Sequence, residues 1–141
     1  MNSKVVIATL IGGVAAFLLG YLIWGVVLHN FMAQNAGSAS GVMKTDMQPT
    51  NMVFIFLGNL AFAYLLTYIF TEWASISTLA GGAKAGALIG FLMTANYDLI
   101  ALGTSNILNT TGTIVDIVVG TVFSALVGAV IGAYLNMQNK A

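Results

Sequence analysis

The chain has 141 residues, of which 59% are hydrophobic and only 6% are charged, and its formal net charge is zero. Since a soluble domain carries about 25% charged residues, this composition excludes an ordinary soluble globular protein. The charge balance also argues against a nucleic-acid partner and against a polybasic lipid-binding patch. The sequence has no cysteine, which excludes disulfides, thiolate catalysis and cysteine metal sites, and we expect no cofactor.

Four apolar runs fill most of the sequence, at residues 5–29, 51–73, 80–103 and 113–136. Each has about 20 residues or more, the length that a helix needs to cross the ~30 Å hydrocarbon layer of a bilayer. The first run is too long for the apolar core of a signal peptide, so we interpret it as a retained helix. We therefore predict an all-α integral membrane bundle of four transmembrane helices, with residues 1–141 forming a single transmembrane domain and no separate soluble domain.

The lysines predict how the bundle is oriented in the membrane. With four spans, Lys4, Lys84 and Lys140 fall on one side, and only Lys44 falls on the other. Positively charged residues are enriched on the cytoplasmic side of membrane proteins. We therefore expect the N- and C-termini to be cytoplasmic and the longest loop, residues 30–50, to face outward. Within this loop, Thr50 is the expected N-cap of the second helix.

Aromatic residues mark the expected membrane–water interfaces. Trp24 lies near the outer end of the first helix, and Tyr68 and Trp73 lie near the inner end of the second. Tyr134 lies near the inner end of the fourth helix. Tyr and Trp are enriched at this depth because their rings are amphipathic, so we interpret these four residues as interfacial anchors.

Small residues recur every four positions in three of the four runs. They are Gly12, Ala16 and Gly20 in the first, Gly82, Gly86 and Gly90 in the third, and Gly120, Ser124, Gly128 and Gly132 in the fourth. In a bilayer, small residues let helix backbones approach closely and gain dispersion contacts. We expect these three helices to pack tightly. The second run is bulkier, and we expect it to face lipid or a neighbouring subunit.

The two halves of the sequence also share a pattern that is consistent with an internal repeat. Residues 12–20 resemble residues 81–90, and residues 56–63 loosely resemble residues 118–125. A duplicated helical hairpin would give the first and third helices equivalent roles. Coincidence is the alternative, because Gly and Ala are common in membrane helices.

Asp98 and Asp116 are the strongest candidates for a functional site. A carboxylate at the centre of a spanning helix costs ~2.5–3.5 kcal/mol, so such residues usually face the protein interior or water. Both fall in the outer half of the bundle, and each continues a stripe of small residues. The other polar residues of that half complete the predicted cluster: Asn59 and Asn96 within it, and Tyr97 or His29 at its edge.

No lysine or arginine lies at the predicted depth of this cluster. Two carboxylates close together in a low dielectric cannot easily both ionise, so one should hold a proton or a cation should bind between them. Three interpretations stay open: a hydrogen-bonded clasp between helices, a proton or cation site in a carrier or channel, and a metal or catalytic site. The third would need His29 as a ligand. Because His29 sits at the membrane edge, we expect no metal site.

The sequence resembles small, uncharacterised bacterial membrane proteins of the domain-of-unknown-function type, which have four helices. The residues that carry the resemblance are the Gly-rich segment 12–20 leading into residues 21–25, the Asn96-Tyr97-Asp98-Leu99 segment, and Val115-Asp116. The resemblance covers most of the chain and implies a bacterial origin, hence the cytoplasmic (inner) membrane. It implies no activity, because those families have no established one.

The absence of a phosphate-binding loop, a nucleophile elbow or an HExxH motif argues against an enzyme. The leading hypothesis is a non-enzymatic membrane protein that works in an assembly, as a homo-oligomer or as an accessory subunit of a larger membrane complex. The alternative is a small carrier or channel for a proton, cation or small solute that uses Asp98 and Asp116. An intramembrane enzyme comes third. The expected partners are the lipid bilayer and other membrane subunits, with no nucleic acid.

Overall fold

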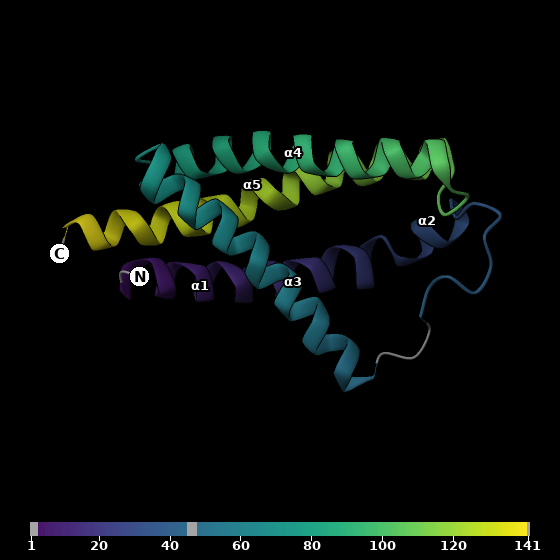
Figure 1. Ribbon diagram of the computed structural model, residues 1–141, viewed down its shortest axis with the longest axis horizontal. Helices are drawn as coiled ribbons and strands as arrows, with labels where there is room; N and C mark the ends of the chain where they lie inside the picture. The colour runs from purple at the N-terminus through teal and green to yellow at the C-terminus, as the bar shows by residue number, and fades with distance from the viewer. Residues whose placement is uncertain (1–2, 45–47, 141) are drawn as a thin grey trace.

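The computed structural model describes residues 3–44 and 48–140 (Figure 1). The first span consists of α1 (Ser3–Gly20) and a π-helical continuation, η1 (Tyr21–Val27), and is followed by the short helix α2 (His29–Gln34). The second span is α3 (Pro49–Tyr68) with its π-helical continuation η2 (Ile69–Trp73), the third is α4 (Leu79–Thr104), and the fourth is α5 (Thr110–Lys140). Within the described residues, four helical segments of 25 to 30 residues are long and apolar enough to cross a membrane. The predicted all-α bundle of four spans is confirmed.

The connections divide the bundle into two ends (Figure 1). Both termini and the connection from η2 to α4 lie at one end, which we call the terminal end. Helix α2 and the connection from α4 to α5 lie at the other, which we call the loop end. An integral membrane protein with this arrangement presents the terminal end on one side of the bilayer and the loop end on the other.

Helices α4 and α5 form a hairpin in which backbone packs on backbone. A Cβ atom added to Gly128 would overlap the carbonyl oxygen of Gly82 and lie 3.0 Å from the Cα atom of Gly86. A Cβ atom on Gly132 would overlap the carbonyl oxygen of Thr78. Only glycine fits at these contacts, and the small residues of both helices line this one interface.

Helix α1 packs against α3 and α5 through side chains. A Cβ atom on Gly12 would lie 2.7 Å from Ile131 of α5 and 3.2 Å from Ala63 of α3, and one on Gly13 would lie 2.9 Å from Leu60 of α3. Gly20 is in looser contact, 3.8 Å from the ring of Phe123. The small residues of the first helix therefore accommodate mainly side chains, and the nearest backbone atom is the Cα atom of Leu60, 3.3 Å from a Cβ atom on Gly13.

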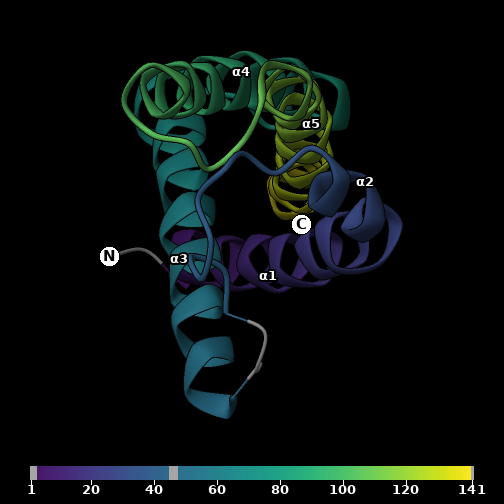
Figure 2. The same cartoon turned by 90° about the vertical axis from the view of Figure 1, so that its right-hand side faces the viewer.

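The expectation that the second helix is outward-facing applies only to its loop-end half. At the terminal end, Ala63, Leu66, Thr67 and Phe70 are fully buried. Towards the loop end α3 diverges from the other helices (Figure 2), and Phe54 is 66% exposed. This bulky helix can pack on α1 because Gly12 and Gly13 leave room there for the side chains of other helices.

The core lies in the terminal half of the bundle, between α1, α3 with η2, and α5. Its members are Ala8, Ala16, Ala63, Leu66, Phe70, Val127, Ile131 and Leu135. Three aromatic rings continue it towards the loop end: Phe123 lies against Trp24, with ring centroids 5.3 Å apart, and stacks on Phe62 at 6.1 Å. The larger side chains thus fill the space that the α4–α5 hairpin leaves open.

Each later span begins at a recognisable signal. Pro49 occupies the first helical position of α3 and Gln48 is its N-cap, so the expected cap at Thr50 is wrong by two residues. The Thr78 hydroxyl accepts a hydrogen bond of 3.0 Å from the amide of Gly81 at the start of α4. The side chain of Asn109 accepts one of 2.8 Å from Gly112, which caps α5 three residues earlier than the apolar pattern indicates.

The loop after the first span is shorter and more structured than expected. Its first residues form α2, and the next pair with the α4–α5 connection through an isolated bridge between Ala36 and Leu108. The amide of Gly37 donates to the carbonyl of Ile107 at 2.8 Å, and that of Asn109 donates to Asn35 at 3.0 Å. The two connections at the loop end are therefore joined over the end of the hairpin.

Candidate functional site

Asp98 and Asp116 face each other across the α4–α5 hairpin. The register of the hairpin explains their meeting: Gly86 lies against Gly128, Gly90 against Ser124, and Thr94 against Gly120. Each step moves four residues forward in α4 and four back in α5, so the next pair is Asp98 with Asp116. The two carboxyl groups lie within hydrogen-bonding reach of each other.

The two carboxyl groups differ in their surroundings. Asp98 is only 5% exposed, and its Oδ2 atom is buried without a hydrogen-bond partner. Asp116 is half-buried, and its Oδ1 atom accepts a hydrogen bond of 2.5 Å from the indole N–H of Trp24. A buried polar atom without a partner is costly, so the Oδ2 atom of Asp98 is the position in this site where a ligand or proton would be stabilised.

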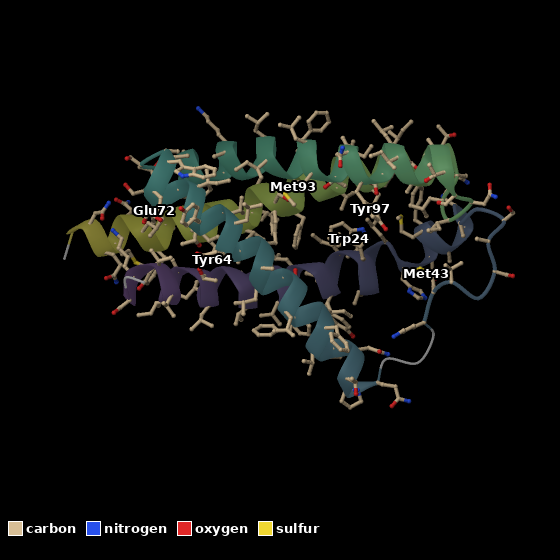
Figure 3. The ribbon with its side chains drawn as sticks, viewed as in Figure 1. Trp24, Met43, Tyr64, Glu72, Met93 and Tyr97 are labelled. Carbon is tan, nitrogen blue, oxygen red and sulfur yellow. The ribbon has the colours of Figure 1, made fainter. Side chains whose placement is uncertain are left out.

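Trp24 reaches this site because the first span becomes π-helical after Gly20. Its side chain points from η1 towards the hairpin (Figure 3) and packs on the ring of Phe123, with an interplanar angle of 75°. The prediction of a purely interfacial Trp24 missed this hydrogen bond. The available signal was the polar N–H of the indole, which needs an acceptor when the ring is buried. π-Helical turns are frequent at functional sites.

A small cavity of about 90 Å³ adjoins the pair on the side of the loop end. Asp98, Asp116 and the buried side chain of Thr113 form its polar wall, and Leu102 and Leu108 are among the apolar residues that line it. Since one water takes about 30 Å³ of liquid volume, the cavity has room for about three waters or for a small cation with part of its hydration shell.

The structure separates the other predicted members from the pair. Asn59 donates to the carbonyl of Ile55 in its own helix, at 2.9 Å, next to Leu60, which packs on Gly13 of α1. Asn96 is exposed, and two residues along a helix it projects from a different face than Asp98. His29 is exposed on α2. Tyr97 lines the cavity while remaining 69% exposed.

Within the part of the chain that the structure describes, no basic side chain is placed beside Asp98 and Asp116 to neutralise their charge. Lys4 and Lys84 belong to the terminal half of their helices, and the ammonium group of Lys44 donates to the side chain of Asn51 at 3.0 Å. Within residues 3–44 and 48–140, no three His, Asp or Glu side chains lie close enough to hold a metal ion together. The arrangement can bind a proton or a single small cation between two carboxyl groups.

Comparisons with protein-family models, with curated proteins and with solved structures found no match to this chain. The resemblance to small bacterial four-helix membrane proteins thus stays a prediction, and the interpretation of the site rests on its geometry.

Proposed function

We propose that this protein is a small, non-enzymatic membrane carrier in which Asp98 and Asp116 bind a proton or a small monovalent cation. The observation that supports the proposal is the Oδ2 atom of Asp98, which is buried without a partner beside a second carboxyl group. In a medium of low dielectric, two adjacent carboxylates repel each other strongly unless a proton or cation lies between them. Intramembrane carboxyl groups of this kind commonly mark proton or ion pathways.

The packing of the bundle supports a carrier rather than an open channel. The cavity beside the pair lies near the loop end, and towards the terminal end the backbones of α4 and α5 close the hairpin at Gly86 and Gly128. Movement of the α1–α3 pair against the hairpin would open a second route. Few contacts join α3 to α5, and α3 diverges at the loop end, so the packing that this movement must rearrange is mainly that of α1 on α5. From the lysine distribution we propose that the terminal end is cytoplasmic, and from the resemblance that the membrane is the bacterial inner membrane.

Flux through the carboxyl pair can be measured in proteoliposomes that contain a trapped pH indicator. After an acid jump, with Na⁺ or K⁺ gradients imposed in separate runs, the wild type should change the internal pH faster than empty liposomes. Asp98→Asn should abolish this flux. Its amide can still hydrogen-bond to Asp116 but takes up no proton at neutral pH, so the folded protein should be retained.

Asn96→Leu is the matched control, because Asn96 is a polar residue of the same helix that faces away from the pair. It should carry flux at the wild-type rate. The carrier proposal would be overturned if Asp98→Asn changed the internal pH as fast as the wild type, or if the wild type changed it no faster than empty liposomes under either cation gradient.

The diverging half of α3 supports a second candidate function, as the contact surface of a homo-oligomer. A Cβ atom on Gly58 would meet no atom within 4 Å. Val53 is 56% exposed and Leu57 is 50% exposed. Asn59 lies in the same half and hydrogen-bonds only within its own helix among the bonds described. Amide side chains on membrane helices promote association, because a second amide can satisfy them.

Association can be measured by energy transfer between labelled copies at a fixed protein-to-lipid ratio. Asn59→Leu should reduce the transfer efficiency if a second copy contacts the Asn59 side of α3, whereas Asn96→Leu on α4 should not. Equal transfer in the wild type and Asn59→Leu would exclude Asn59 from the contact surface, and the same measurement on Leu57→Asn tests the side that carries Val53 and Leu57.

A further inference from the structure

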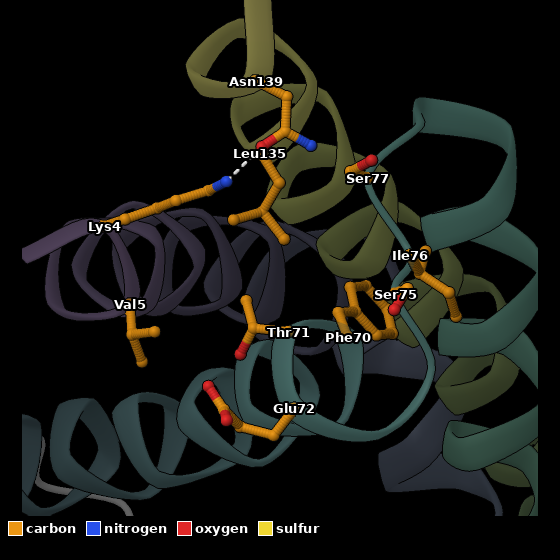
Figure 4. A pocket seen from close by; sticks show the side chains of 10 residues that line it. All are labelled: Lys4, Val5, Phe70, Thr71, Glu72, Ser75, Ile76, Ser77, Leu135 and Asn139. Carbon is orange, nitrogen blue, oxygen red and sulfur yellow. Dashed lines mark hydrogen bonds between the residues drawn. The ribbon is translucent and has the colours of Figure 1, made fainter. Parts of the chain in front are cut away.

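A second cavity lies at the opposite end of the bundle from the carboxyl pair. It has a volume of about 310 Å³ and opens where α1, η2, the η2–α4 connection and the end of α5 converge (Figure 4). This volume lies at the lower end of the range for small-molecule sites, about 300–1,000 Å³, and would suit a headgroup rather than a whole lipid. The carrier proposal does not involve this cavity.

The rim of the cavity carries charges of both signs, contributed by different elements. Lys4 of α1 extends towards the side chain of Asn139 of α5 and hydrogen-bonds to its Oδ1 atom. Glu72 of η2 lies across the opening, next to Thr71 (Figure 4). The site therefore offers a positive group and a negative group to one ligand rather than a net charge.

Three hydroxyl side chains also line the cavity: Thr71 beside Glu72, and Ser75 and Ser77 on the η2–α4 connection (Figure 4). Ser75 has a φ of +50°, in the left-handed region that residues other than glycine rarely adopt. Such conformations are found at ligand-binding turns, where the surrounding structure holds them in place.

The inner wall of the cavity is apolar. Val5 and Phe70 are buried, and Leu135 is 1% exposed. The neighbouring residues indicate the level of the cavity in the membrane. Trp73, directly after Glu72, is 72% exposed, and its ring lies 5.4 Å from that of Tyr68. Exposed Trp and Tyr rings at the end of a membrane helix mark the level of the lipid headgroups.

From this combination we propose that the terminal-end cavity binds the headgroup of a phospholipid with a primary amine, of the phosphoethanolamine type. Lys4 and the hydroxyls of Ser75 and Ser77 contact the phosphodiester, Glu72 accepts hydrogen bonds from the ammonium group, and the acyl chains lie in the bilayer beside the apolar wall. A choline headgroup fits less well, because a quaternary ammonium donates no hydrogen bond and is usually recognised by a cage of several aromatic rings. Phe70 is the single aromatic residue among the described residues that line the cavity.

The test is native mass spectrometry of the delipidated full-length protein with added dioleoyl phosphatidylethanolamine, phosphatidylcholine or phosphatidylglycerol. The wild type should bind the ethanolamine lipid about tenfold more tightly than the choline lipid, which corresponds to one charge-assisted hydrogen bond. Glu72→Gln should remove this preference. Lys4→Gln should weaken binding of all three lipids, because they share the phosphodiester.

Lys84→Gln is the matched control, since Lys84 is a lysine of the same terminal half and does not line the cavity. It should leave the tenfold preference unchanged. The three substituted positions are at the surface, and a melting curve of each variant checks that it is folded.

Three results would overturn the proposal. The first is equal binding of the ethanolamine and choline lipids by the wild type, and the second is an unchanged preference in Glu72→Gln. The third is displacement of the ethanolamine lipid by inorganic phosphate at millimolar concentration, which would identify a site for soluble phosphate instead.

Discussion

The two helical pairs of this bundle begin from similar sequence patterns and pack in different ways. In α4–α5, small residues lie on both helices, and backbones touch at Gly82 and Gly128. In α1–α3, the stripe of small residues on α1 mostly meets larger side chains: Gly13 accommodates Leu60, and Ala63, opposite Gly12, is the small residue on the α3 side. Even if the halves arose by duplication, their packing has diverged. A stripe of small residues thus gives a backbone contact only where the opposing helix carries a matching stripe.

The difference also explains why the carboxyl pair is located in one hairpin. Backbone contact fixes the register of α4 against α5 at every fourth residue, which holds Asp98 opposite Asp116. The α1–α3 pair contacts mainly through side chains, as far towards the loop end as Phe17 against Phe56, and its polar residue, Asn59, hydrogen-bonds within its own helix. Close packing brings polar groups together at a defined distance, and divergence separates them.

The largest expected effect comes from adding the same side chain to each pair. Gly128→Val places a branched side chain against the carbonyl of Gly82 and the Cα atom of Gly86, where no side chain can move aside. We expect a loss of about 3 kcal/mol in the free energy of unfolding. Gly12→Val meets the Cγ1 and Cδ1 atoms of Ile131, a side chain that can change rotamer, and should cost about 1 kcal/mol.

Unfolding of the two variants by sodium dodecyl sulfate in bicelles, followed by tryptophan fluorescence, measures both losses on one scale. A cost for Gly12→Val equal to that of Gly128→Val would contradict the distinction between backbone and side-chain packing.

A smaller effect is expected where the two pairs meet, at the hydrogen bond from Trp24 to Asp116. Trp24→Phe keeps an aromatic ring against Phe123 and removes the N–H donor. Hydrogen bonds between membrane helices contribute about 0.6 kcal/mol on average and at most about 1.7, so we expect a loss of about 1 kcal/mol.

The same bond can be followed by fluorescence in a Trp73→Phe background, where Trp24 is the only tryptophan. Asp116→Asn should shift its emission, because the carboxyl acceptor is replaced by an amide. An emission spectrum that is the same with Asp and Asn at position 116 would argue against this hydrogen bond in the membrane.

The four spans could be predicted from the sequence because run length and hydropathy alone determine whether a helix crosses a bilayer. The sequence also places Asp98 and Asp116 on packed helix faces, since both continue stripes of small residues, but it leaves open whether they meet within one chain or between two subunits. The position of Trp24 could not be predicted, because it depends on a π-helical turn after Gly20 for which the residues give no distinct signal. The cluster predicted around Asn59 failed for a related reason: helical rise predicts a depth along α3, but the direction in which Asn59 projects and the course of α3 arise from packing with the whole bundle.

The smallest expected effect comes from replacing a glycine by alanine in each pair. This replacement should stabilise the protein in one pair and destabilise it in the other. Alanine is about 1 kcal/mol more favourable than glycine inside a helix, so Gly58→Ala, whose added methyl group meets no atom within 4 Å, should raise the unfolding free energy by about 0.5–1 kcal/mol. Gly86→Ala gains the same propensity, but its methyl group would overlap the carbonyl of Ser124 and lie 3.1 Å from the Cα atom of Gly128. The overlap should exceed the gain, so that variant should be less stable than the wild type. If both variants were stabilised in the same unfolding assay, the contact between α4 and α5 would be looser than the structure indicates, and the register that holds Asp98 opposite Asp116 would lose its support.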